Sequence, residues 1–457
     1  MRVPPQALPV QRLALRFLAS SHLVHIVCVL LVFVSLRVFV SLRDGIDPVG
    51  DGHVIVGVLL GQFWVGEITF EQLIGYNTFV HFITDRTNQL FYPLLISLQG
   101  PIGWTIETHL LVLNTVLGSV LVAGSYFTAL RLWNKSYAVL VALLMCSLTP
   151  LYWIARFGVP DNAFYAMIPI FGLSVINWYE KRSLKALAFM LVGLGAFALT
   201  RPEAILIILA VTSVLVWDFL RRYWSRRFLI GASSLAVATA CVAAIAVSYS
   251  SPSLHRTLLS RRHIAWGLAM SSQTLLNDMS ASASGGTSEY DRLQYYYTSE
   301  AVSARAEPDT NPNDDSSISY LMSRDSIEII RSNPLWYVSK IPIRGLALLF
   351  PWTYQPWSLR HVLYEAAYTI FIVTGVMLLI RRGSPQVPLL VLMAIPSAIW
   401  IFLSVYGIDN DLKHRNGIFV ALNQIAPLGF FLAPRSRRLS PEGTPSDGTG
   451  SLPGVCT

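Results

Sequence analysis

The strongest constraint on this fold is a series of long apolar runs, each close to the length of a membrane-spanning helix. Such a helix needs about 20 mostly apolar residues. Apolar residues make up 53% of the 457 positions and only 13% are charged, roughly half the charged share of an average soluble protein. We therefore predict an all-α polytopic membrane protein with ten spans, at 22–42, 106–130, 136–154, 161–179, 185–200, 203–219, 228–249, 362–381, 385–405 and 415–433.

The distribution of basic residues predicts how these spans are oriented. If the N-terminus is cytoplasmic, every cytoplasmic connection carries Lys or Arg, as at Arg131, Lys181, Arg221 and Arg381. Cytoplasmic loops are enriched in these residues, which also explains the net charge of +8 without a nucleic-acid partner. We expect a multi-pass protein of the inner (plasma) membrane with both termini in the cytoplasm. The run 22–42 exceeds the apolar core of a signal peptide, about 7–15 residues, and is predicted to be a retained first span.

Two long connections fall on the extracytoplasmic side and divide the chain into four parts. The first connection, 43–105, contains apolar positions at helical spacing in 52–65 and 69–83, which predicts short amphipathic helices at the membrane interface. The second forms an extracytoplasmic loop subdomain. The predicted parts are a transmembrane module at 1–249, the loop subdomain at 250–361, the last spans at 362–433, and a disordered cytoplasmic tail at 434–457.

Ionisable residues near a membrane are costly and often functional, and on the extracytoplasmic side they form four clusters. The first follows the first span and contains Asp44, Asp47, Asp51 and His53. These carboxylates are candidates for a general base, with a divalent metal ion as a candidate cofactor. The alternative is a solvated loop in which the aspartates serve turns and His53 is an ordinary polar residue.

The second cluster lies at the start of the predicted span at 161–179, and the third lies between the spans predicted at 185–200 and 203–219. Arg156 and Asp161 belong to the second cluster, and Asp161 has an alternative duty as the N-cap of the span at 161–179. Arg201 and Glu203 occur in Thr-Arg-Pro-Glu between two spans, where Glu203 suits the positive end of a helix. Arg201 is a candidate ligand for an anionic lipid head group, or alternatively a generic interfacial arginine.

The fourth cluster, at the start of the last span, consists of Asp409, Asp411, Lys413, His414 and Arg415. Three basic groups in a row on the extracytoplasmic side run against the positive-inside rule. A phosphate-binding pocket explains this exception, because arginine matches phosphate oxygens bidentately. No P-loop, dinucleotide fingerprint, nucleophile elbow or HExxH motif occurs in the sequence, so nothing supports a nucleotide-dependent reaction.

In their order, these motifs resemble those of the bacterial GT-C fold glycosyltransferases, multi-spanning enzymes that use polyprenyl-phosphate sugars. The resemblance covers most of residues 22–433. It rests on Asp51-Gly52-His53, Phe91-Tyr92-Pro93-Leu94, Arg156-Phe157-Gly158 with Asp161, Thr200-Arg201-Pro202-Glu203, and Lys413-His414-Arg415. The chain departs from the family pattern at Gly52, where a second acid is common, and at Asn416-Gly417, where Leu-Pro is usual.

The resemblance implies an inverting sugar transfer from a polyprenyl-phosphate donor to an envelope glycan or lipid acceptor. Asp51 is then the expected general base, followed by Asp44 and Asp47. Donor phosphate is expected at Arg201, Lys413, His414 and Arg415, with Asp161, Glu203, Arg156 and His53 as acceptor-binding or orienting residues.

Two other functions remain open from the sequence. A transporter or flippase of lipid-linked glycans also needs many spans, although transporters favour interrupted helices with charge near the bilayer midplane. A non-catalytic assembly subunit is the third possibility.

Overall fold

The computed structural model describes residues 21–46, 52–76, 78–80, 82, 89–201, 203–223, 315–332, 334–349, 359–382, 387–406 and 412–431. The elements assigned in these segments are helices, as predicted. The first half of the bundle consists of α2 (His22–Asp44), α8 (Ile106–Leu132), α9 (Lys135–Ser147), α10 (Thr149–Ile154) and α11 (Asp161–Lys181). The rest consists of α12 (Leu184–Ala198), α13 (Glu203–Tyr223), α22 (Leu359–Arg382), α23 (Val387–Tyr406), α24 (Leu412–Asn423) and α25 (Leu428–Phe431).

Polar caps explain where several of these helices begin. Thr105 accepts a hydrogen bond from the backbone N–H of Thr108 (3.3 Å), and Asn134 accepts one from Tyr137 (3.0 Å). Ser183 caps α12 in the same way. Each cap satisfies one of the backbone donors that a helix leaves unpaired in its first turn. Short polar side chains thus divide apolar sequence, which by composition alone has no clear boundaries.

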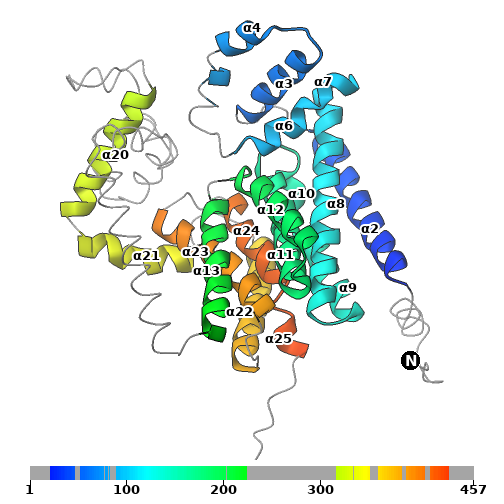
Figure 1. Cartoon of the computed structure of the whole chain (residues 1–457), viewed down its shortest axis with the longest axis vertical. Coiled ribbons are helices and arrows are strands. Elements are labelled where there is room, and N and C mark those ends of the chain that lie inside the picture. Colours follow the sequence, from blue (N-terminus) through cyan, green and yellow to red (C-terminus); the bar gives the residue numbers. More distant parts are fainter. Residues whose placement is uncertain are drawn as a thin grey trace, which may run out of the picture.

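Helix α11 lies at the centre of the bundle and packs against α8, α10, α12, α23 and α24. Its first half is buried almost continuously, whereas α2 buries only one stripe with a four-residue spacing (His25, Val29, Phe33, Arg37 and Ser41). Figure 1 shows α11 enclosed by its neighbours and α2 on the outside of the bundle, against α8. The residues at the start of α11 are therefore placed where several helices meet.

Two of the predicted spans are broken. The span predicted at 136–154 divides into α9 and α10 at Leu148, next to Pro150. Because proline has no N–H, the carbonyl of Cys146 loses its helical donor, and the Tyr152 hydroxyl donates to it instead (2.7 Å). The span predicted at 415–433 divides into α24 and α25 for a similar reason, described below.

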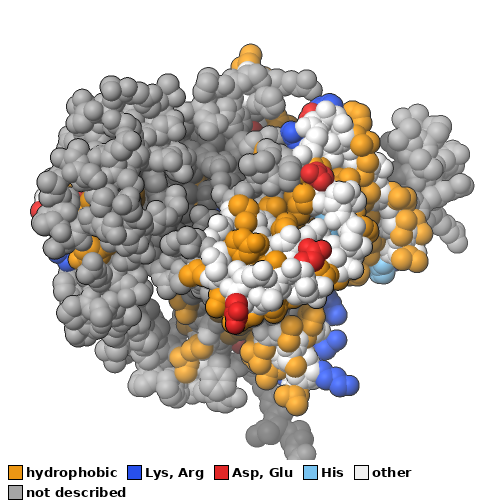
Figure 2. All heavy atoms as spheres, turned by 90° about the horizontal axis from the view of Figure 1, so that it is seen from above, with side chains coloured by type: hydrophobic (Ala, Val, Ile, Leu, Met, Phe, Trp, Pro, Cys, Tyr) orange, Lys and Arg blue, Asp and Glu red, His pale blue; other side chains and the backbone are white. Residues whose placement is uncertain are grey.

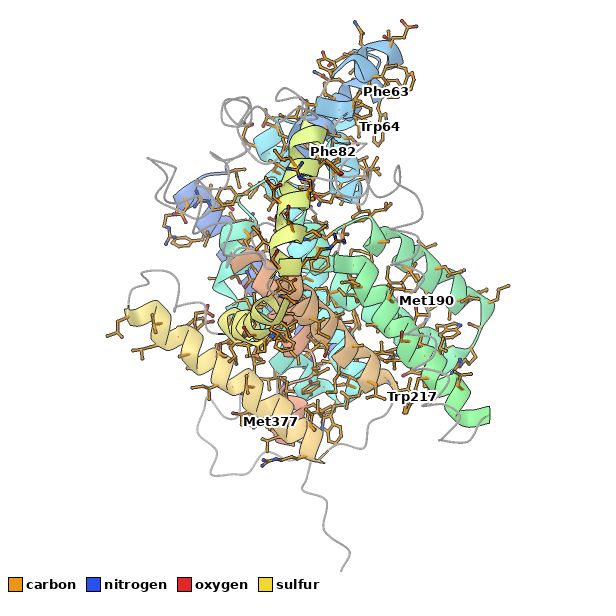
Figure 3. The ribbon with its side chains drawn as sticks, turned by 90° about the vertical axis from the view of Figure 1, so that its left-hand side faces the viewer. Phe63, Trp64, Phe82, Met190, Trp217 and Met377 are labelled. Carbon is orange, nitrogen blue, oxygen red and sulfur yellow. The ribbon has the colours of Figure 1, made fainter. Side chains whose placement is uncertain are left out.

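Three helices are long and apolar enough to cross a membrane: α2, α8 and the stretch Val362–Arg381 of α22. They indicate an integral membrane protein. Other predicted spans coincide with shorter apolar helices, and the predicted span at 228–249 lies outside the described residues, so the count of ten stays a prediction. Exposed apolar side chains such as Trp217 and Met377 lie on the bundle in Figure 3, as expected for surfaces that face lipid.

Short helices gather at one end of the bundle (Figure 1): α3 (His53–Trp64), α4 (Phe70–Gly75), α6 (Phe91–Ser97) and α7 (Gln99–Ile102). They confirm the helices predicted in 52–65 and within 69–83. Their outer side chains include exposed Trp64, Phe70 and Ile74. Figure 2 shows this end from above, with a few acidic side chains among hydrophobic ones. Within the predicted loop subdomain, α20 (Asp315–Ser332) contacts α21 (Pro334–Leu349), and α21 contacts α23.

Candidate functional site

The candidate site lies at the end of the bundle that carries the short helices. Asp44 ends α2, Arg156 lies in the turn 155–160, Asp161 begins α11, and Arg201 lies two residues before the start of α13. These residues come from three of the four clusters expected from the sequence. The contacts below place them in two ion pairs, Arg156 with Asp44 and Arg201 with Asp161, next to the turn 155–160 that precedes α11.

Asp161 and Arg201 form a buried ion pair, in which the guanidinium Nη1 contacts the carboxylate Oδ1. Their side chains are only 5% and 9% exposed. The Arg201 guanidinium also lies over the ring of Phe164, 5.6 Å from its centroid, and that ring stacks on Phe197 at 5.5 Å. Arg201 is therefore held from two sides, by a carboxylate and by an aromatic face.

This pair corrects two alternatives left open by the sequence. The N-cap of α11 is Pro160, which makes no side-chain capping bond, and the Asp161 carboxylate pairs with Arg201 instead. Arg201 is also not a generic interfacial arginine, because it is buried. Since Asp161 already balances its charge, a phosphate bound here has to share Arg201 with that carboxylate.

Arg156 joins the turn 155–160 to the end of α2. Its Nε donates to the carbonyl of Gly45 (2.9 Å) and its Nη2 to the carbonyl of Asp44. These bonds satisfy carbonyls at the negative end of the α2 dipole. Arg156 also lies 3.7 Å from the Asp44 carboxylate, which Arg43 contacts bidentately at 2.7 and 2.8 Å. Two arginines thus favour the ionised form of Asp44, which makes it a weaker proton acceptor than an unpaired carboxylate.

A neutral chain of hydrogen bonds lies beneath these ion pairs. The Tyr92 hydroxyl donates to Asn114 Oδ1 (2.9 Å), and Asn114 Nδ2 donates to the carbonyls of Ala155 (2.9 Å) and Phe157 (3.2 Å). Tyr92 on α6 is completely buried, and burial raises the pKa of its hydroxyl above the usual value, so it remains a neutral donor. It connects α6 with α8 and the turn that carries Arg156.

Arg37 extends the network into the apolar part of α2. Its side chain is fully buried, its Nη1 donates to the carbonyl of Tyr152 (2.8 Å), and its Nη2 donates to that of Ala155. Sequence reasoning missed both Arg37 and Asn114, because they fall inside predicted spans. A single arginine and a single asparagine within long apolar runs were the signals, since a polar group in a span is expected to face a partner in the bundle.

His53 is not a loop residue, because it begins α3 and is 1% exposed. Its Nε2 lies 2.6 Å from Gln89 Oε1, and its ring meets Phe82 edge to face at 4.9 Å. Figure 3 shows Phe82 near this end of the molecule. These contacts join the start of α3 to the segment before α6.

Of the fourth cluster, only the backbone of the three basic residues is described, at the start of α24. Lys413, His414 and Arg415 occupy the first turn of this helix, and their side chains lie outside the described part. Two residues further along the chain, Gly417 packs against the ring of Phe164, where an added Cβ would lie 3.0 Å from a ring carbon. Phe164 is the ring beneath Arg201, so α24 packs against a residue that contacts the ion pair.

Asn416 is a further site candidate that the sequence marked only as a departure from the family pattern. It is 3% exposed, and its Nδ2 has no hydrogen-bond partner among the described residues. A buried unpaired amide is costly, so this donor suits an acceptor oxygen of a ligand or of a bound water.

Several predicted residues remain untested. Asp47 and Asp51 lie outside the described residues, and for Glu203 only the backbone at the start of α13 is described. In the segments that are described, no three His, Cys, Asp or Glu side chains gather as metal ligands. The divalent metal therefore stays a prediction that depends on the undescribed acids.

Four arginines lie in the described part of this site. Arg43 and Arg156 contact the Asp44 carboxylate, Arg201 contacts Asp161, and Arg37 donates to backbone carbonyls. Arginine forks suit phosphate oxygens, and the surrounding apolar helices strengthen electrostatic interactions. Comparison of the chain with protein-family models and with curated proteins finds no match.

Proposed function

We propose that this protein is a membrane glycosyltransferase that moves a sugar from a polyprenyl-phosphate donor to an envelope glycan or lipid acceptor on the extracytoplasmic face. The observation that carries the proposal is the convergence of Asp44, Arg156, Asp161 and Arg201 at one end of an apolar bundle. This end combines carboxylates with several arginines. Such a combination suits a reaction in which a hydroxyl loses a proton and a phosphate leaves.

The transfer proceeds in one displacement with inversion. The acceptor hydroxyl oxygen attacks the anomeric carbon, the bond from that carbon to the donor phosphate breaks, and polyprenyl phosphate leaves with the bonding electron pair. The hydroxyl proton passes to a carboxylate base. Fixed cations stabilise the charge that develops on the phosphate. The prenyl chain stays in the lipid alongside the apolar helices.

The base is assigned to Asp51, with Asp44 and Asp47 as the next candidates. Asp44 is the weakest of these, because Arg43 and Arg156 already hold its carboxylate. The leaving phosphate is assigned to Arg201, Lys413, His414 and Arg415, of which the last three lie at the start of α24. Arg156, Asp161, Glu203 and His53 orient these groups or the acceptor.

Sugar transfer by membranes that contain the wild-type protein or the Asp51→Asn variant tests the proposal. The donors are labelled polyprenyl-phosphate sugars and the acceptor is envelope material. We expect the variant to lose at least about 100-fold in rate, the typical contribution of a general base, at unchanged protein level. The matched control is Glu180→Gln, which removes a carboxylate that pairs with Arg131 on another part of the bundle.

Full transfer by Asp51→Asn refutes the base assignment and directs the search to Asp47. If the wild type transfers sugar from none of the polyprenyl-phosphate donors, the enzyme proposal is rejected for this donor class.

The second candidate function, transport of a lipid-linked glycan, is favoured by the break between α24 and α25. The residues at the break, 424–427, include Pro427, and Asn423 and Gln424 are 0% and 1% exposed. Transporters bind cargo at interrupted helices. None of these residues is charged, whereas the charged network lies at the end of the bundle, which favours the transferase. If the reconstituted protein moves a labelled lipid-linked glycan across the vesicle membrane and transfers no sugar, the transporter becomes the favoured function.

A further inference from the structure

We propose that Arg37 is a positioning residue, which together with Asn114 fixes the turn 155–160, and that Arg156, assigned above only an orienting role, thereby also binds the phosphate of a lipid ligand. The identity of the ligand as a phosphate rests on the proposed function. The hold of Arg37 and Asn114 on the turn, called the clamp below, does not, because it follows from hydrogen bonds between described residues.

Arg37 supplies one side of the clamp. A fully buried arginine in an apolar helix is costly unless its donors are paired, and Arg37 directs two of its nitrogens to the carbonyls of Tyr152 and Ala155. These carbonyls lie at the end of α10, where a helix leaves carbonyls without backbone donors. The guanidinium therefore replaces helical hydrogen bonds at the point where the chain turns toward Arg156.

Asn114 supplies the other side. Its amide donates to the carbonyls of Ala155 and Phe157, the two neighbours of Arg156 in the chain. Asn162 on α11 lies 3.4 Å from the same Phe157 carbonyl. Side chains from α2, α8 and α11 thus hold the peptide groups on both sides of Arg156.

The clamp determines where the Arg156 side chain emerges. With both flanking carbonyls held, its guanidinium reaches the end of α2, where it is 19% exposed and still contacts Asp44. It is therefore accessible from outside the bundle, in contrast to Arg37. An arginine held in place loses less conformational entropy when it binds phosphate, so the clamp should increase affinity without contacting the ligand.

A simpler role for Arg37 is to supply positive charge near the ligand. Asn114 distinguishes the two roles, because it is neutral and holds the same turn. If the clamp acts by positioning Arg156, Arg37→Gln and Asn114→Leu both weaken phosphate binding. If Arg37 acts only through its positive charge, Arg37→Gln weakens binding and Asn114→Leu does not.

The experiment measures binding of undecaprenyl phosphate, and of undecaprenol as the phosphate-free probe, to the purified full-length protein in nanodiscs. The two controls lie elsewhere in the same bundle: Arg131→Gln removes an exposed arginine, and Thr128→Val removes a buried hydroxyl of α8. We expect both clamp variants to raise the Kd for undecaprenyl phosphate on the order of tenfold, equivalent to one charge-assisted hydrogen bond. Undecaprenol binding and both controls should remain at the wild-type level.

Hydrogen–deuterium exchange over residues 155–162 provides a readout that does not depend on the ligand. Exchange should accelerate there in both clamp variants and stay unchanged in the rest of the bundle. If Arg37→Gln does not fold, Arg37→Lys takes its place, since it keeps the charge and lacks the guanidinium fork. The same loss of affinity and the same faster exchange are then expected.

Unchanged exchange in the clamp variants overturns the positioning role. So does wild-type affinity for undecaprenyl phosphate in Asn114→Leu. If the wild type binds no undecaprenyl phosphate, the proposed function fails on its own, and exchange over 155–162 still decides whether Arg37 and Asn114 clamp the turn.

Discussion

The ion pair between Asp161 and Arg201 allows a quantitative test of how the candidate site is stabilised. Its side chains are 5% and 9% exposed, so each charge has lost most of its hydration and depends on the other. Removing one partner from a buried pair typically costs about 3–5 kcal/mol, because an uncompensated charge remains. We expect Arg201→Met to fall in this range. Asp161→Leu should lie at its lower end, because the ring of Phe164 retains a cation–π contact with Arg201 worth about 2 kcal/mol when desolvated.

The double variant carries the decisive information. Replacing both members of a buried pair with apolar residues is often neutral or stabilising, so Asp161→Leu with Arg201→Met should be more stable than either single variant. The two changes are therefore expected to be strongly non-additive. Equilibrium unfolding in mixed micelles measures the free energy of unfolding of the wild type, of both single variants and of the double variant.

The control cycle uses Arg131 and Glu180, an ion pair with a distance of 3.0 Å whose side chains are 47% and 37% exposed. Exposed pairs contribute about 0.2–1 kcal/mol. If the cycle for Asp161 and Arg201 gives a coupling energy no larger than this control, the argument from burial is refuted.

Three further predictions concern packing near the site and at the helix break. Gly417→Ala adds a Cβ 3.0 Å from the ring of Phe164 and should cost about 1–3 kcal/mol in unfolding free energy, the usual effect of overpacking; equal stability would show that α24 can shift. Tyr137→Phe removes the hydroxyl that donates to the Gln424 carbonyl at the break (2.6 Å) and should cost about 1–3 kcal/mol, measured by thermal unfolding against wild type. Gly429→Ala should reduce the yield of folded protein on size-exclusion chromatography, because its Cβ would lie 1.9 Å from a backbone oxygen of α22, and a normal yield would contradict that packing.

The helix break shows where sequence patterns stop being informative. The run 415–433 is apolar enough to read as one span, yet the chain turns after Asn423. Pro427 cannot donate a backbone hydrogen bond to the Asn423 carbonyl, and hydroxyl groups of other helices bind neighbouring acceptors at the break. Tyr137 donates to the Gln424 carbonyl, and Tyr368 donates to the Asn423 side chain. A proline in a span signals a kink, but its consequence depends on partners that are distant in sequence.

The sequence alone determined that this is a helical membrane protein, and it marked several residues of the candidate site. Apolar runs of membrane length predict helices, and helices occur at all the predicted spans that the structure describes. Charged clusters at the ends of those runs marked Asp44, Arg156, Asp161 and Arg201, because charge is tolerated at span ends and costly within them.

Only the tertiary structure decided which of these charges are paired and what supports them. Asp161 could have capped its own helix, but Arg201, 40 residues away in sequence, lies close enough to bind it. Arg37 and Asn114 had no visible partner in the sequence, because the groups to which they donate are backbone carbonyls, which every residue carries. Hydrophobicity is a property of each residue and can be read along the chain, whereas a buried charge is stabilised by groups that only the packing of the helices brings within hydrogen-bonding distance.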